Sequence, residues 1–136
     1  MTKHKIFSLP IRVYFQDTDA GGVVYHANYL NFMERARTEW LRERYGYSNA
    51  ELMKKFGVVF VVRSLKLDFL KPALLDDMLS VTAQIKDIGR SRLALLQNVL
   101  RGDEVLTEAD VHLVCVSLES FKPVSMPEVL RNQWKG

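Results

Sequence analysis

The chain has 136 residues, of which 48% are hydrophobic and 26% charged, and its formal net charge is +3. These values are typical of a single globular domain with one core. The weak positive charge, without a run of basic residues, argues against a nucleic-acid-binding protein. The sequence has no signal peptide and no apolar stretch of membrane-spanning length, so it predicts a cytoplasmic protein without a membrane span.

The cysteine and histidine content argues against disulfides and metal sites. Cys115 is the single cysteine and lies in an apolar run, which favours a buried core residue. No group of His, Asp or Glu residues has the spacing of metal ligands. The sequence therefore predicts no metal and no cofactor.

The N-terminal half predicts two helices. Residues 1–9 read as a loose arm and residues 11–16 as a short β-strand. From about residue 27 to 45 the apolar residues follow a helical period, with Tyr29, Met33, Ala36 and Trp40 on one face, and Gly46 provides a stop. A second helix is predicted over residues 48–55, where Ser48 and Glu51 form a capping box and Gly57 ends the helix.

The C-terminal half predicts strands over residues 58–69, 79–86, 92–100 and 105–118, followed by a short helix over 126–133 in a weakly structured tail. Tight turns between these strands favour antiparallel pairing. The expected fold is α+β, with a curled, mostly antiparallel five-stranded sheet around one long helix. One helix covers only one face, so an edge strand or the outer face is expected to pair with another subunit.

The block from Asp17 to Tyr29, Asp-Thr-Asp-Ala-Gly-Gly-Val-Val-Tyr-His-Ala-Asn-Tyr, lies directly before the long helix. A carboxylate at this place can act as a nucleophile or base, and free N–H groups of the helix can stabilise an oxyanion. This pairing suits acyl transfer. A plain turn made of Asp and Gly is the structural alternative.

The same block carries a family resemblance. The string Arg12-Val-Tyr-Phe-Gln-Asp-Thr-Asp-Ala-Gly-Gly-Val-Val-Tyr-His-Ala-Asn-Tyr29, with Glu34-Arg-Ala-Arg-Thr-Glu39, resembles the hotdog-fold thioesterases of the 4-hydroxybenzoyl-CoA thioesterase type. Within that type it is most similar to the acyl-CoA thioesterases associated with the Tol-Pal envelope system. The resemblance covers roughly residues 10–128 and implies one hotdog domain over residues 1–136.

The resemblance also implies roles for residues. Asp19 would be the catalytic carboxylate, acting by direct attack or by activating water. The backbone N–H of His26 or Ala27 would polarise the thioester carbonyl. Acyl-CoA would bind at the interface of a homodimer, dimers would pair into tetramers, and coenzyme A would be part of the substrate rather than a cofactor.

Further site residues follow from their chemistry. Gly22 lets substrate approach the backbone, and Tyr25 is expected to form a pocket wall. The His26 side chain would orient water or the carboxylate or assist the leaving group, or it is a structural residue at the helix start. Asp17 is expected to stabilise the turn. Two further sets are expected to bind substrate: Phe60, Val61 and Val62 as an acyl channel or as core, and Arg90 and Arg92 as contacts for the phosphates of coenzyme A.

Two other functions compete with thioester hydrolysis. Hotdog dehydratases carry a His-Phe-Pro type motif, which this sequence lacks. A non-catalytic scaffold that binds acyl-CoA or acyl carrier protein, linked to envelope lipid metabolism, is the main alternative; the link to the envelope rests on the resemblance alone.

Overall fold

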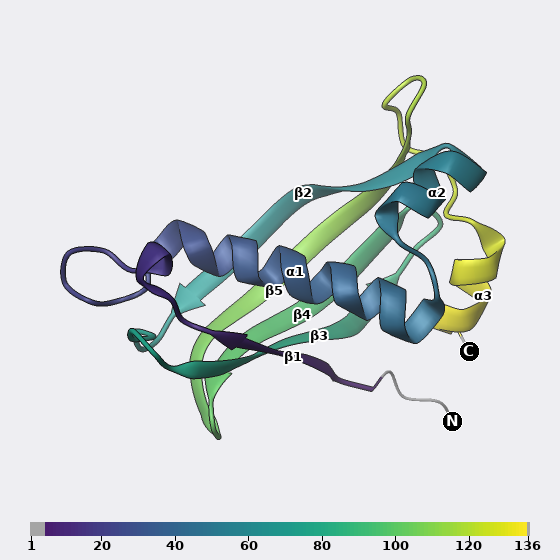
Figure 1. Cartoon of the computed structure of the whole chain (residues 1–136). Helices are drawn as coiled ribbons and strands as arrows, with labels where there is room; N and C mark the ends of the chain where they lie inside the picture. Colours follow the sequence, from purple (N-terminus) through teal and green to yellow (C-terminus); the bar gives the residue numbers. More distant parts are fainter. Residues whose placement is uncertain (1–4, 136) are drawn as a thin grey trace.

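The structure is a computed structural model that describes residues 5–135 (Figure 1). Its sheet has five strands in the spatial order β1-β3-β4-β5-β2, and every pairing is antiparallel. The strands are β1 (Phe7–Arg12), β2 (Val58–Phe69), β3 (Met78–Ile88), β4 (Arg92–Arg101) and β5 (Glu104–Ser117). The helices are α1 (His26–Tyr45), α2 (Asn49–Phe56) and α3 (Glu128–Lys135), with a short 3₁₀ helix, η1 (Phe15–Asp17). This α+β arrangement confirms the predicted fold class.

Helix α1 lies across one face of the sheet, and α2 and α3 lie near the end where α1 finishes (Figure 1). Its predicted apolar face is buried, including Ala36 with no exposed surface. Gly46 ends the helix in the left-handed conformation at φ 78°, and its N–H donates to the Arg42 carbonyl. The predicted start and end of α1 are therefore correct to within one residue.

The predicted capping box of α2 is also present. The Glu51 N–H donates to Ser48 Oγ at 3.1 Å, and the Ser48 N–H donates to Glu51 Oε1 at 2.9 Å. These bonds hold the pKa of the Glu51 carboxyl below its ordinary value. Gly57 closes the helix at φ 64°.

The first strand is where the sequence prediction is wrong. Strand β1 runs from Phe7 to Arg12 and pairs with β3, whereas residues 13–16 turn away into η1. Residues 7–9 are therefore part of the sheet, and residues 1–4 of the predicted arm lie outside the described residues. The strand contains Pro10, and β1 is an edge strand, where a missing N–H is tolerated.

Strand β2 contains a bulge that keeps alternate residues of its two halves on the same face of the sheet. It pairs with β5 from Val58 to Phe69, but the register shifts between Val62 and Ser64, leaving Arg63 as the extra residue. Because of this shift, Phe60 and Val62 before the bulge face the same way as Leu65 and the residues that alternate with it. Phe60 and Val62 of the first half and Leu65 and Leu67 of the second thus face α1, whereas Val59 and Val61 face the opposite side.

Strand β2 is also the second edge of the sheet, and its outer edge pairs with no strand of residues 5–135. Val61, Val62 and Leu65 remain 36%, 43% and 39% exposed. An edge strand of 12 residues with exposed apolar side chains is a ready site for pairing with another chain.

The C-terminal tail is more firmly packed than predicted. Helix α3 begins at Glu128 and buries Leu130 and Trp134. The Trp134 ring stacks on Trp40 of α1 at 5.5 Å and 19°. None of the helices between residues 5 and 135 combines the length and apolar composition of a transmembrane span.

Candidate active site

The loop that carries Asp19 is a tight turn beyond the N-terminal end of α1 (Figure 1). The Asp19 N–H donates to the Val23 carbonyl at 2.9 Å, and the Gly22 N–H donates to the Asp19 carbonyl at 3.1 Å. Gly22 adopts φ 80°, a conformation that favours glycine. The Asp19 carboxylate itself is exposed and accepts a bond from the Gly21 N–H at 2.8 Å. The turn therefore presents this carboxylate to solvent in a fixed position.

Asp17 fastens the turn to the helix. It is 7% exposed, and its carboxylate accepts a hydrogen bond from the Tyr14 N–H at 2.9 Å. Its carbonyl accepts bonds from the Tyr25 N–H at 2.9 Å and from Asn28 Nδ2 at 3.0 Å. This is the stabilising role predicted for Asp17, and it sets the place of the neighbouring Asp19.

The segment before β3, residues 73–75, also holds the loop by hydrogen bonds. The Val24 N–H donates to the Ala73 carbonyl at 2.9 Å, and the Ala73 N–H donates to Tyr29 Oη at 3.0 Å. The Leu75 N–H donates to the Gly22 carbonyl at 3.2 Å. The residues before β3 thus hold both the loop and the first turn of α1.

The N-terminus of α1 retains open hydrogen-bond donors. The Asn28 N–H donates to the Tyr25 carbonyl at 2.8 Å, but Tyr25 makes no side-chain cap. Among residues 5–135, no group accepts a hydrogen bond from the backbone N–H of His26 or Ala27. These two donors carry the partial positive charge of the helix end. They are suited to bind a carbonyl oxygen that becomes negative.

The side chains of Tyr25 and His26 lie at this helix end. Their rings are 4.4 Å apart with an interplanar angle of 39°, and both side chains are exposed. The structure therefore brings the loop residues Asp19 and Gly22 and the helix-start residues Tyr25, His26 and Ala27 to one end of the molecule.

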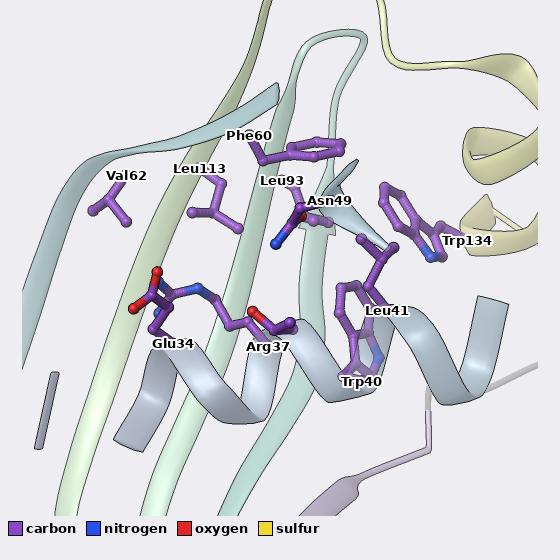
Figure 2. A pocket seen from close by; sticks show the side chains of 11 residues that line it. Glu34, Arg37, Trp40, Leu41, Asn49, Phe60, Val62, Leu93, Leu113 and Trp134 are labelled. Carbon is purple, nitrogen blue, oxygen red and sulfur yellow. The ribbon is translucent and has the colours of Figure 1, made fainter. Parts of the chain in front are cut away.

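A groove between α1 and β2, which we call the α1–β2 groove, begins one turn after this helix end. It consists of two cavities that share Glu34, Arg37 and Val62. The cavity nearer the N-terminus of α1 has a volume of about 230 Å³ and the other about 80 Å³ (Figure 2). The remaining lining residues are Leu30, Asn31, Met33, Leu65 and Val111 in the first cavity and Thr38, Trp40, Leu41, Asn49, Phe60, Leu93, Leu113 and Trp134 in the second.

The predicted acyl-channel residues separate onto two faces of β2. Phe60 and Val62 line the α1–β2 groove, whereas Val61 faces the other side of the sheet. There Val61 lines a second depression, of about 680 Å³, together with Arg90 and Arg92. We call it the basic groove; its other residues are Arg63, Ser91, Val114, Val116, Phe121 and Pro123.

The sequence analysis missed Arg37, a polar residue of the α1–β2 groove, and the buried glutamine that contacts it. Gln97 has no exposed surface and lies under α1, where its side-chain oxygen accepts a hydrogen bond from Arg37 Nη1 at 3.1 Å. One signal in the sequence could have identified Gln97. It occupies the inward position of β4, between Leu95 and Val99, where an apolar residue is expected.

The side chains of Cys115 and His112 lie away from the site. Cys115 is buried, and its burial raises the pKa of the thiol to about 11. His112 is exposed on the outer face of the sheet. Within the described part of the chain, no group of three or more His, Cys, Asp or Glu residues is placed to hold a metal ion.

Comparisons with known proteins agree with this geometry. Residues 13–134 match the family model described as thioesterase-like superfamily. The acyl-CoA thioesterase YbgC of Haemophilus influenzae is 42% identical over 125 residues, which cover 92% of this chain and 91% of that protein. The acyl-CoA thioester hydrolase YbgC of Escherichia coli O157:H7 is 42% identical over 131 residues, 96% of each chain.

A solved structure supports the same assignment. The crystal structure of a probable thioesterase from Bartonella henselae superposes with a TM-score of 0.86 at 36% identity and covers 90% of this chain and all of that one. Together with the sheet wrapped around α1, these matches confirm the predicted hotdog architecture. The chain belongs to the thioesterase-like superfamily.

Proposed function

We propose that the protein hydrolyses acyl-CoA thioesters to a free acid and coenzyme A. The observation that carries this proposal is the exposed Asp19 carboxylate, held in a hydrogen-bonded turn at the same end of the molecule as two open N–H donors of α1. Relatives that are 42% identical over nearly the whole chain bear the names acyl-CoA thioesterase and acyl-CoA thioester hydrolase. A charged carboxylate and an oxyanion site are the two parts that thioester hydrolysis needs.

In this proposal the carbonyl oxygen of the thioester accepts hydrogen bonds from the His26 and Ala27 N–H groups. One preorganised donor of this kind typically lowers the barrier by about 3–4 kcal/mol. The Asp19 oxygen attacks the carbonyl carbon, the C–S bond breaks, and the thiolate of coenzyme A leaves; water then cleaves the mixed anhydride. In the second form of the mechanism, Asp19 takes a proton from water and the resulting hydroxide attacks the carbon; the C–S bond then breaks, and the proton passes from Asp19 to the departing thiolate or to solvent.

The neighbouring residues would hold the reacting group. The Gly22 backbone leaves room for the thioester, since no side chain projects there. Tyr25 forms a wall of the site, and the His26 imidazole orients water or the carboxylate or assists the departing thiolate. These roles are supported by the exposure of both rings at the helix end.

The basic groove is suited to the phosphates of coenzyme A. Arg63, Arg90 and Arg92 gather there beside apolar residues that suit the adenine and the pantetheine arm. This groove lies toward the Val58 end of β2, whereas the α1 N-terminus lies toward the Phe69 end, where the rings of Tyr29 and Phe69 are in contact. Within one chain, the basic groove therefore lies away from Asp19.

A homodimer would resolve this separation. If two copies of β2 pair antiparallel along their free edges, the Val58 end of one copy, which carries the basic groove, comes beside the Phe69 end of the other, toward which the helix N-terminus lies. The exposed apolar side chains of β2 support such pairing. We further propose that dimers associate into tetramers and that the enzyme works in the cytoplasm on acyl-CoA or acyl carrier protein thioesters of envelope lipid metabolism; these points rest on the family resemblance.

The decisive experiment is thiol release from short, long and aromatic acyl-CoAs by the wild type and by Asp19→Asn. The variant keeps the shape of the side chain and removes its charge, so we expect a loss of about 10³-fold or more in kcat. Asp103→Asn is the matched control, because Asp103 is exposed in the turn between β4 and β5. It should retain full activity.

Two outcomes would contradict the proposal. If the wild type binds acyl-CoA but releases no thiol from any member of the panel, the protein is an acyl-binding scaffold. If Asp19→Asn and Asp103→Asn are equally active, the carboxylate lies elsewhere and the Asp19 turn is structural.

A further inference from the structure

We propose that the α1–β2 groove binds an acyl chain that carries a hydroxyl group and that Arg37 is the residue that recognises this hydroxyl. The inference rests on the proposed hydrolysis of acyl-CoA and assigns the acyl part of that substrate. The starting observation is that Arg37, a cation, lies among mostly apolar residues of the groove and has few hydrogen-bond partners.

Arg37 is a largely buried cation with unused hydrogen-bonding capacity. A guanidinium has five N–H donors, and the structure pairs Nη1 with Gln97 Oε1 at 3.1 Å. No carboxylate of residues 5–135 forms an ion pair with it. Burial lowers the pKa of the Arg37 guanidinium from its ordinary value, and the charge of Glu34 partly offsets this effect. Arginine nevertheless stays protonated in proteins, so the charge must be solvated in place.

Gln97 holds this cation in position. Its amide nitrogen donates to the Met33 carbonyl of α1 at 3.0 Å and to the Thr82 carbonyl of β3 at 3.2 Å. Both amide hydrogens are thereby used, and the side-chain oxygen is fixed toward Arg37. A buried glutamine with both donors used and its oxygen bonded is a rigid support.

The unused donors of Arg37 face the groove. Arg37 lines both cavities, and Figure 2 shows its side chain extending along α1 toward Glu34, with Val62 and Leu113 across the groove. Among the described residues, the fully buried side-chain atoms without a partner are Thr107 Oγ1 and Trp134 Nε1, and no atom of Arg37 is among them. The unpaired N–H groups of Arg37 are therefore accessible from the groove. A ligand that enters the groove would meet these N–H groups and displace the water that solvates them.

The charges around the groove favour a hydroxyl group over the alternatives. An unsubstituted chain would remove water from the guanidinium without replacing its hydrogen bonds, which is costly. A carboxylate would bond to Arg37 but would be repelled by Glu34, whose charge already acts on Arg37. A hydroxyl accepts from Arg37 and can donate to Glu34, and it leaves the net charge of the pair unchanged.

The position of Arg37 also sets where the hydroxyl must lie. Helical side chains lean toward the N-terminus, and Gln97 ties the guanidinium to the level of Met33. The rise from Ala27 to Met33 is about 9 Å. The hydroxyl is therefore expected near the far end of a medium-length chain, and a decanoyl chain is a suitable probe.

The experiment compares decanoyl-CoA, ω-hydroxydecanoyl-CoA and the ω-carboxy analogue of equal length. Dissociation constants are measured by calorimetry on Asp19→Asn, with and without Arg37→Met, which keeps the apolar stem and removes the donors. Arg35→Met is the matched control, because Arg35 is exposed on the same helix and its loss changes the charge equally. Thermal unfolding of each variant checks that it is folded.

We expect the hydroxylated ligand to bind about 10- to 100-fold more tightly than decanoyl-CoA, a hydrogen bond to a charged group being of that strength. Arg37→Met should abolish this preference, and Arg35→Met should retain it. Equal affinities for the two ligands, or a preference that survives Arg37→Met, would overturn the inference, as would tightest binding of the carboxy analogue. Failure of the proposed hydrolysis is seen separately, as absence of thiol release by the wild type.

Discussion

The two ends of helix α1 are built in opposite ways. At the C-terminal end, Gly46 closes the helix, and Trp40, Tyr45 and Trp134 form an interlocking aromatic cluster. At the N-terminal end, the N–H groups of His26 and Ala27 remain open, and the nearby rings are exposed. Stability is concentrated at one end, and the unsatisfied groups that chemistry requires are at the other.

The largest expected effect is on stability, at the packed end. Trp134→Ala should lower the free energy of unfolding by about 3–5 kcal/mol, because Trp134 has no exposed surface and contacts Trp40, Tyr45 and Phe60. Tyr25→Ala at the open end is the comparison and should change stability by less than about 1 kcal/mol, since that ring is 48% exposed. Urea unfolding of both variants measures the difference. Equal losses would mean that the two ends are equally important for stability.

The next effect is on catalysis, at the open end. His26→Pro removes the N–H of the first helical residue, and Tyr25 before it already has the extended conformation, φ −63° and ψ 133°, that proline requires of its predecessor. We expect kcat for acyl-CoA hydrolysis to fall about 10²- to 10³-fold relative to His26→Ala, with little change in stability. The alanine variant controls for the imidazole. If both variants are equally active, the His26 N–H does not bind the oxyanion.

The buried thiol near the packed end gives a pH test. Phe60 contacts Trp134 and pairs with Cys115, whose pKa is raised by burial from 9.0 to about 11. The folded state therefore holds the thiol proton more tightly than the unfolded chain. The stabilisation that results from this difference is fully present below pH 9 and is lost as pH rises toward 11. Between pH 7 and pH 10, the free energy of unfolding of the wild type should fall by about 1.4 kcal/mol more than that of Cys115→Ala. Parallel pH profiles in urea unfolding would contradict this.

A matched pair of glycines sharpens the comparison further. Gly46 and Gly22 have nearly the same conformation, φ 78° and φ 80°, and at both positions a side-chain methyl group would project into open space. Substitution by alanine at either position should cost about 1 kcal/mol of stability, because the left-handed conformation strains a residue with a Cβ. Only Gly22→Ala should also lower kcat, because it strains the turn that positions Asp19. A loss of kcat in Gly46→Ala of the same size would show that the effect is general rather than local.

The sequence predicted the elements that local chemistry determines. The limits of α1, the capping box at Ser48 and the alternation of β3 were correct because each depends on residues close in the chain. The failures depend on distant partners. Strand β1 was placed too late because only its pairing with β3 defines it, and α3 was underestimated because Trp134 packs against residues far along the chain.

The candidate site divides in the same way. Asp19 and the start of α1 could be chosen from one continuous motif, and Asp17 has the structural role expected for it. The pairing of Arg37 with Gln97 joins residues 60 positions apart, and no local pattern reveals it. The separation of Val61 from Phe60 and Val62 follows from strand alternation, which the sequence analysis had not applied to this apolar run.

The bulge at Arg63 shifts the alternation of inward and outward side chains along β2 by one residue. Upstream, the even-numbered Phe60 and Val62 face α1; downstream, the odd-numbered Leu65 and Leu67 do. Without the bulge, a regular strand of the same length would turn Lys66 and Asp68 toward the helix and the leucines toward solvent. The extra residue and the bulge therefore go together: deleting Arg63 would remove both and leave Leu65 and Leu67 facing α1, whereas a one-residue insertion or deletion elsewhere in β2 would reverse one half of the strand.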